Sequence, residues 1–329
     1  MLSYMLSQYA RLPVPEVTLR SWLKQWLSEQ ESRCTDRSFS ARFPWRETGL
    51  CQEYFLQRKL KIDGKQFLTG PRYQGGNINK PFIDIVGMDS DLNHTALELI
   101  SKEWSQLRAQ YVRILVPGQS FPQGIPDQYI YATSFSEPPE FNDKSLTLQV
   151  ATYEDFDWCC QALGDAYKHT WQTVRELSAS NLVAVDDEEL CDHISEREVY
   201  IIYENDVRAG LLICQKGNIA FLRGYRITDK VILPAFRGRS LSARAQRLLY
   251  RLLTHSDSEL SLYMGTIIPE NIPSMKTAER AGRTCILSYQ FFYPSAEPTI
   301  NINANLSSAY FRFWHTGDVQ GPGVLPRTH

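Results

Sequence analysis

The sequence lacks the features by which membrane, secreted and metal-binding proteins are recognised. No stretch approaches the roughly 20 apolar residues that a membrane-spanning helix needs. Met1 to Arg11 shows no basic region followed by a long apolar core, so no secretory signal is expected. The seven cysteines form no C-x-x-C pair, and the six histidines show no metal-ligand spacing. We therefore expect a cytoplasmic protein with no membrane association, no disulfide framework and no metal site.

A surplus of positive charge is also missing. The 35 Lys and Arg residues against 37 Asp and Glu residues give a net charge of −2, so no nucleic-acid partner is expected. Hydrophobic residues make up 43% and charged residues 22%, as in ordinary soluble globular proteins. A chain of 329 residues has room for about two domains.

The domain boundary is expected in a polar segment at 137–144, which contains the adjacent residues Pro138 and Pro139. Before it, strand patterns at 82–88 and 111–116 flank a helix pattern at 95–110, which predicts a parallel strand pair with a helical crossover. The expected parts of the chain are an N-terminal domain at 1–140 with a leading amphipathic helix at 17–31, a C-terminal domain at 145–295 and a docking tail at 296–329.

The C-terminal domain shows a longer series of alternating patterns. A bulge is expected at 223–225 in its longest strand. The predicted elements are a strand at 146–151, helices at 153–167 and 186–195, a hairpin of strands at 199–203 and 207–214, a long strand at 218–233, a helix at 240–254, a strand at 260–266, a helix at 272–281 and a strand at 284–293.

The most informative segment runs from Ile232 to Ser242 and reads I-L-P-A-F-R-G-R-S-L-S. It follows a strand and opens a helix, so its backbone N–H groups and the helix N-terminus are expected to converge on one anion. Arg237 and Arg239 add positive charge beside that point. Such a site suits a pyrophosphate, although a helix-capping turn of a purely structural unit would show the same residue types.

This segment resembles the acetyl-coenzyme A signature of the GNAT superfamily, V-x-P-x-(aromatic)-R-G-x-G-x-G/A. The residues that match are Ile232, Pro234, Phe236, Arg237 and Gly238. The sequence departs from the signature in having serine at 240 and at 242, where the family has glycine, or glycine and alanine.

A second element supports the resemblance. Asn271 and Ser274, followed by Ala278 and then Gly282-Arg283, are similar to the family's N-x-x-A/S…G-F element. Many members have a catalytic tyrosine seven residues after that asparagine, and Ala278 stands there in this chain. The order of predicted elements over 146–293 also agrees with the family.

The resemblance implies an α/β (α+β) fold in which helices flank a mixed central sheet. It also implies that 145–295 binds acetyl-CoA and that 1–140 is a degenerate GNAT-like copy, as in tandem GNAT proteins. Asn271 and Ser274 would contact the coenzyme arm, or would simply cap a helix. The residues that would pair with the pantetheine or hold the pyrophosphate are Val231, Ile232, Leu233, Arg237, Gly238, Arg239, Ser240, Leu241 and Ser242.

Catalytic residues are less well marked. Asp229 is the candidate base, although Asp229-Lys230 also reads as a surface ion pair. Tyr263 and Tyr289 are candidate hydroxyl donors, or else buried packing residues. The candidate acceptor site, alternatively a half-buried helix end, consists of Tyr167, His169 and Trp171.

The sequence as a whole favours an N-acyltransferase that moves an acetyl group from acetyl-CoA directly to a primary amine of a small molecule. Two alternatives stay open. One is a Fem-type aminoacyl transferase that uses aminoacyl-tRNA, and the other is a non-catalytic acyl-CoA-binding or scaffold protein. The sequence leaves the acceptor and the oligomeric state open.

Overall fold

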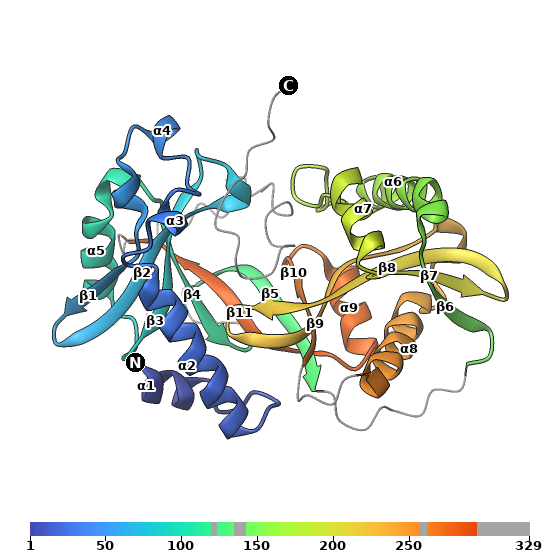
Figure 1. The fold of residues 1–329 in the computed structure, drawn as a ribbon, viewed down its shortest axis with the longest axis horizontal. Helices are drawn as coiled ribbons and strands as arrows, with labels where there is room; N and C mark the ends of the chain where they lie inside the picture. Colours follow the sequence, from blue (N-terminus) through green and yellow to red (C-terminus); the bar gives the residue numbers. More distant parts are fainter. Residues whose placement is uncertain (120–123, 135–142, 257–261, 295–329) are drawn as a thin grey trace. The chain divides into compact units, whose positions relative to one another are not determined.

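The computed structural model describes residues 1–119, 124–134, 143–256 and 262–294 (Figure 1). Contacts divide the chain into two compact units. Unit 1 lies within 1–128 and resumes at Leu287, and unit 2 lies within 129–286. The expected boundary at 137–144 falls almost wholly outside the described residues, and the tail at 296–329 falls wholly outside them. The domain limits 1–140 and 145–295 therefore stay predictions.

The sheet of unit 1 has the strand order β1-β2-β3-β4-β11. Strands β3 and β4 are parallel, and the other neighbouring strands are antiparallel. The elements of unit 1 are α1 (Leu2–Gln8), α2 (Glu16–Ser32), α3 (Arg37–Ser40), α4 (Trp45–Thr48), β1 (Arg58–Ile62), β2 (Lys65–Tyr73), β3 (Pro81–Met88), α5 (His94–Glu103), β4 (Tyr111–Pro117) and, from Leu287 on, β11 (Thr284–Phe292).

The strand–helix–strand motif predicted in unit 1 is confirmed, since α5 connects the parallel strands β3 and β4. The predicted helix end at 110 is wrong, because α5 ends at Glu103. Trp104 leaves the helical conformation there and is fully buried, and its indole Nε1 donates a hydrogen bond to the Thr69 hydroxyl (2.9 Å). The buried indole thus fixes the chain in a short 3-10 turn instead of a further helical turn.

A buried ion cluster lies in the sheet of unit 1. The guanidinium of Arg113, on β4, donates to both carboxylate oxygens of Asp84 (2.9 and 3.0 Å) and to Asp127 (3.0 Å). The ring of Tyr289 lies against it, with 4.2 Å from the ring centroid to Cζ of Arg113. This buried cation is therefore compensated by two carboxylates, as burial of a charge requires.

The sheet of unit 2 has the strand order β5-β10-β9-β8-β7-β6. The element order predicted for 146–293 and the mixed sheet flanked by helices are confirmed, and α6 and α7 lie on one face while α8 and α9 lie on the other (Figure 1). The elements are β5 (Ile125–Ser134), β6 (Leu146–Val150), α6 (Phe156–Thr173), α7 (Asp187–Ser195), β7 (Val199–Glu204), β8 (Val207–Ile219), β9 (Leu222–Ile232), α8 (Leu241–Ser256), β10 (Leu262–Ile267) and α9 (Ile272–Arg280).

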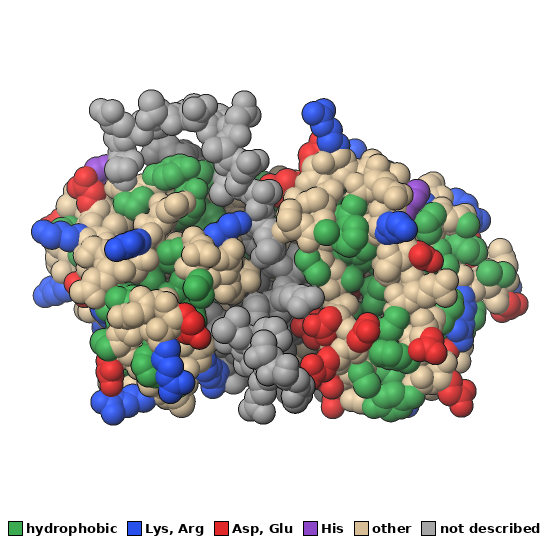
Figure 2. Space-filling model, turned by 90° about the horizontal axis from the view of Figure 1, so that it is seen from above, with side chains coloured by type: hydrophobic (Ala, Val, Ile, Leu, Met, Phe, Trp, Pro, Cys, Tyr) green, Lys and Arg blue, Asp and Glu red, His purple; other side chains and the backbone are tan. Residues whose placement is uncertain are grey.

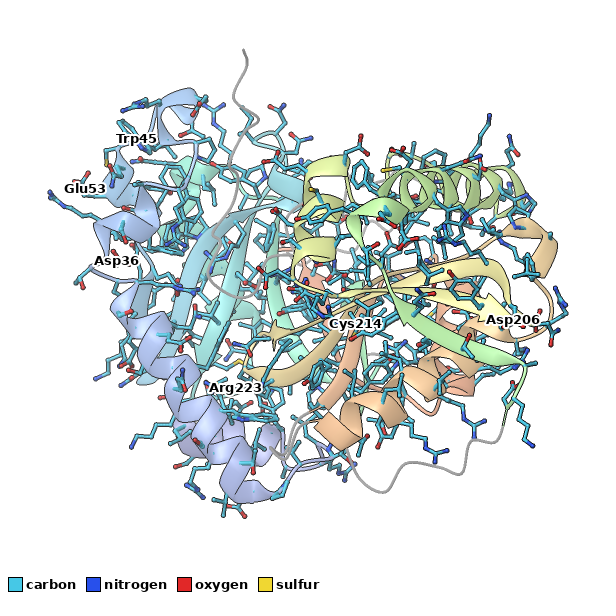
Figure 3. The ribbon with its side chains drawn as sticks, turned by 45° about the vertical axis from the view of Figure 1, so that its right-hand side comes forward. Asp36, Trp45, Glu53, Asp206, Cys214 and Arg223 are labelled. Carbon is cyan, nitrogen blue, oxygen red and sulfur yellow. The ribbon has the colours of Figure 1, made fainter. Side chains whose placement is uncertain are left out.

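The bulge of β9 is at Thr228 and not at 223–225 as expected, because the register with β8 shifts from Cys214↔Ile227 to Ile213↔Asp229. Cys214, labelled in Figure 3, marks this place on β8. Gly224, within the expected range 223–225, is instead a point of close contact with β10. Its φ is +153°, and a Cβ there would lie 1.9 Å from the carbonyl oxygen of Leu262 on β10. Glycine at 224 therefore permits the close approach of β10 to β9.

Candidate functional site

Strands β9 and β10 diverge, which opens the sheet of unit 2 along one edge of β9. They pair in parallel only from Gly224 to Arg226, opposite Leu262 to Met264. Beyond that point β9 continues to Ile232, while β10 continues along β5 on its other side. The edge of β9 after Arg226 is therefore turned toward an opening between the two strands.

Alternation along β9 decides which backbone groups face this opening. The Leu233 N–H donates to the carbonyl of Ala209 on β8 (2.9 Å). Because directly opposed residues of an antiparallel pair alternate in hydrogen bonding, Val231 also bonds to β8, whereas Lys230 and Ile232 direct their backbone groups away from it. The Lys230 N–H is bonded to Asp229 Oδ1 (2.7 Å) and the Ile232 carbonyl accepts from Arg237, so the Ile232 N–H and the Lys230 carbonyl are the groups that face the opening. The predicted backbone contacts at Val231, Ile232 and Leu233 stay a prediction, and of these three residues only Ile232 directs a backbone group away from β8.

The loop after β9 contains two left-handed residues just before α8 begins. Residues Pro234–Phe236 form a 3-10 turn, and α8 starts at Leu241. Between them, Gly238 (φ +81°) and Ser240 (φ +55°) are left-handed, and a Cβ built on Gly238 would meet nothing within 4 Å. The unbonded N–H groups of the first turn of α8 follow directly after these two residues. Ser242 lies in that first turn.

The two arginines of the loop have different surroundings. The Arg237 guanidinium donates to the carbonyls of Ile232 (3.0 Å) and Ala166 (2.9 Å), so it ties the loop to β9 and to α6. Arg239 is half exposed and pairs with Glu204 at 3.0 Å. Arg237 therefore positions the loop, and Arg239 is the more accessible cation.

The start of α9 brings the predicted residues Asn271 and Ser274 close to Lys230 on β9. The Asn271 side chain accepts a hydrogen bond from the Ser274 N–H (3.1 Å), which makes it the N-cap of α9. The Ser274 hydroxyl in turn lies 3.4 Å from Nζ of Lys230 on β9. The capping interpretation of Asn271 is thus confirmed, and Ser274 keeps its hydroxyl toward β9.

Asp229 and Lys230 do not form a surface ion pair, so that interpretation was wrong. Asp229 is buried, and both its oxygens accept from the hydroxyl of Tyr167 on α6 (2.9 and 2.8 Å). The bulge at Thr228 causes this, because without it Asp229 would share a face with Ile227, which packs in the core beneath α8. Burial raises the pKa of Asp229, and it raises the pKa of Tyr167 well above its ordinary value.

Lys230 and Arg283 are residues that sequence reasoning missed. Burial, followed by the nearby charge of Arg283, lowers the pKa of Lys230 to about 7. Arg283 is 1% exposed, and its guanidinium donates a hydrogen bond to Gln246 Oε1. The sequence signal that could have pointed to it is arginine at 283, where the similar family element carries phenylalanine.

The remaining predicted residues are placed as follows. Tyr263 is 1% exposed and packs against Tyr250 (5.8 Å between ring centroids), and burial raises its pKa well above the ordinary value. Tyr289 belongs to unit 1, where its ring lies against Arg113, and its predicted role stays a prediction. The ring of Trp171 meets that of Tyr167 edge-on at 6.0 Å, and His169 lies two residues earlier on α6, half-buried.

Two further classes of site were sought. Among the described residues, no group of three His, Cys, Asp or Glu side chains is arranged to hold a metal ion. In the same part of the chain, no helix is both long and apolar enough to cross a membrane. On the face shown in Figure 2, basic side chains are interspersed with acidic ones and form no continuous basic patch.

Comparison with known proteins gives similarity at the level of structure. No model of a protein family and no curated protein matches the sequence. The chain is similar to a GCN5-related N-acetyltransferase from Sphaerobacter thermophilus (11% identity, 80% of this chain and 96% of that one, TM-score 0.44) and to a GNAT-family acetyltransferase from Colwellia psychrerythraea (10%, 82% and 96%, 0.45). It is also similar to a tandem GNAT protein from the clavulanic acid biosynthesis pathway (10%, 80% and 97%, 0.41). At TM-scores below 0.5, these similarities do not define the function of this chain.

Proposed function

We propose that unit 2 binds an acyl-coenzyme A, acetyl-CoA in the simplest case, and transfers the acyl group to a primary amine. One observation carries this proposal. The diverging edge of β9 leads directly into a loop with left-handed Gly238 and Ser240 and then into the N-terminus of α8. An open strand edge suits the two amides of a pantetheine arm, and the loop suits its pyrophosphate.

The residues present fit such a coenzyme. Gly238 has open space around it, and the first turn of α8 supplies N–H donors to an anion. The backbone N–H of Ile232 faces the opening. Arg237 holds the loop, and Ser274 presents a hydroxyl at the far side of the opening. The coenzyme would supply a thioester, whose carbonyl carbon is the electrophile.

The amine is proposed to approach the open edge of β9 from the α6 face of the sheet. Asp229 and Tyr167 lie on the α6 face, beside Trp171, where the amine is proposed to bind. In the proposed reaction the amine nitrogen bonds to the thioester carbon and the carbon–sulfur bond breaks. The proton of the amine passes to the Tyr167 hydroxyl as that hydroxyl gives its own proton to Asp229, and the thiolate leaves and is protonated by solvent. Correct orientation of amine and thioester supplies further rate.

Binding of the coenzyme is the first test. Wild-type protein is titrated with acetyl-CoA in a calorimeter, alongside Ser240→Glu, which places a carboxylate in the loop. Gln149→Glu adds the same charge at an exposed position on β6 and is the matched control. We expect micromolar binding by the wild type and the control, and at least about a tenfold loss in Ser240→Glu. Absence of binding by the wild type would overturn the proposal.

Turnover separates this proposal from its alternatives. Release of free thiol from acetyl-CoA, measured over a panel of small primary amines, is expected for an acyltransferase. Binding without thiol release from any amine would favour the non-catalytic acyl-CoA-binding protein. Absence of coenzyme binding together with use of aminoacyl-tRNA would favour the Fem-type transferase.

A further inference from the structure

Two cations, Arg283 and Lys230, are positioned along the opening between β9 and β10. The Arg283 guanidinium packs over the Tyr263 ring (5.6 Å from Cζ to the ring centroid). It also packs against Gly265, where a Cβ would lie 2.9 Å from Nη1 of Arg283 and 3.3 Å from the carbonyl oxygen of Ile227. Glycine at 265 therefore makes room for the guanidinium where β10 begins to part from β9. Lys230 stands further along β9, and the charge of Arg283 acts on it.

The surroundings of these cations differ from those of Arg113 in unit 1, although the charge of Asp229 acts to raise the pKa of Lys230. No ion pair joins Lys230 or Arg283 to an acidic side chain among the described residues, and Nε of Arg283 is a buried donor with no acceptor. The carboxylate nearest in sequence, Asp229, is directed to the opposite face and bonded to Tyr167. Among the described residues, the charge of the buried Arg283 guanidinium is compensated by one amide oxygen and one aromatic face. Since no carboxylate neutralises it there, an anionic ligand would complete this site.

The position of the cations indicates which part of a ligand they would meet. The loop at Gly238 to Ser240 marks the pyrophosphate end of the proposed coenzyme path, and Ile232 and then Lys230 follow along the strand edge. Arg283 lies beyond them, at Gly265, so it stands past the point where the pantetheine would end. The group that reaches this end of the opening is the acyl group itself.

We propose that the acyl donor of this protein is an acyl-CoA whose acyl chain ends in a carboxylate, held by the half-buried Lys230 and drawn by the buried charge of Arg283. This inference rests on the proposed function. The terminal carboxylate takes no part in the reaction. The amine nitrogen still bonds to the thioester carbon, the carbon–sulfur bond still breaks, and the product is an amide that carries a free carboxylate.

The test compares CoA, acetyl-CoA and succinyl-CoA as ligands of the whole chain by calorimetry at pH 6, where Lys230 is protonated. We expect succinyl-CoA to bind about 10- to 100-fold more tightly than acetyl-CoA, the range given by one hydrogen-bonded ion pair. Lys230→Met and Arg283→Met should each reduce this preference, taken as the ratio of the affinities for succinyl-CoA and acetyl-CoA in the same variant. Lys276→Met removes the same charge from an exposed position on α9 and should keep the preference.

The outcomes distinguish the two proposals. If none of the three ligands binds, the proposed function fails. If CoA and acetyl-CoA bind but succinyl-CoA binds no more tightly, the carboxylate inference alone is overturned. A preference that survives in Lys230→Met also overturns it, and this variant keeps the test valid if the buried Arg283→Met does not fold.

Discussion

At the scale of single residues, Asp229 and Tyr167 form one unit whose proton is shared across a buried hydrogen bond. We predict that Asp229→Asn lowers kcat for acyl transfer by about 10²- to 10⁴-fold, because the amide cannot accept the proton. The Kd for acetyl-CoA should change little, because the coenzyme is proposed to bind along the edge of β9 and at the loop 237–242, and not at the Asp229 side chain. Asp165→Asn, at an exposed position on α6, is the control. Full kcat in Asp229→Asn would exclude Asp229 as the base.

Lys230 should make stability depend on pH. Its pKa is about 7 in the folded protein and returns to the ordinary value of 10.5 on unfolding. Between these values the unfolded chain binds more protons, so its contribution to the free energy of unfolding rises as pH rises from about 7 toward 10. Below pH 7 the lysine is charged in both states and its full penalty applies.

The measurement is the difference in Tm between the wild type and Lys230→Met from pH 6 to pH 10. Lys276→Met, which removes an exposed charge, serves as reference. We expect the advantage of Lys230→Met over the wild type to be largest near pH 6 and to shrink as pH rises. A difference in Tm that stays constant with pH would show that Lys230 ionises normally in the folded protein.

These residue roles were only partly predictable. Asp229 and Tyr167 were each selected from the sequence, but their pairing spans 62 residues and local patterns carry no sign of it. Lys230 was interpreted as the partner of Asp229 because the two are adjacent. The bulge at Thr228 decides which face of the sheet Asp229 and Lys230 occupy. One extra residue in a strand moves the side chains of all the following residues to the opposite face.

At the scale of elements, the parting of β9 and β10 depends on Gly224. We predict that Gly224→Ala lowers the free energy of unfolding by about 3 kcal/mol or more, because the methyl group would collide with the backbone of Leu262. Gly164→Ala is the matched control. Nothing lies within 4 Å of a Cβ at Gly164, which is exposed in the middle of α6, so alanine should stabilise the protein by about 0.5–1 kcal/mol.

Urea unfolding, followed by circular dichroism, measures both changes. If Gly224→Ala cost no more than about 0.5 kcal/mol, the parallel contact between β9 and β10 would be looser than the register at Leu262 indicates. Should both alanines prove destabilising to the same degree, the effect would belong to glycine replacement in general and not to this contact.

The order of elements was predictable because it rests on local signals. Amphipathic spacing defined α8 and α9, and turn residues defined the hairpin of β7 and β8. The pairing of β11 could not be predicted, because the pattern of a strand does not show which strand it pairs with. From Leu287 on, β11 pairs with β4 and belongs to unit 1, although its sequence continues the series of unit 2.

At the scale of the whole molecule, the two units differ in the one place where a coenzyme phosphate would bind. In unit 1 the turn after β3 carries carboxylates, Asp89 and Asp91, and leads to a helix start that is already capped. The Asn93 side chain caps α5 by accepting from the Ala96 N–H (2.8 Å), and Asp89 accepts from the Gln66 N–H (2.7 Å). In unit 2 the corresponding turn has left-handed Gly238 and Ser240 and no carboxylate.

We therefore predict that each chain binds one molecule of acetyl-CoA. The carboxylates of the turn in unit 1 would repel a pyrophosphate, and its helix start is already capped. Calorimetric titration should give a stoichiometry near one, and Ser240→Glu should weaken this single binding event and leave no second site of unchanged affinity. A stoichiometry of two, or a half-sized signal in that variant, would show that unit 1 also holds a coenzyme. A value of one would mean that unit 1 keeps a strand–helix–strand framework without this site, so that its own turn residues, and not the framework, decide where the coenzyme binds.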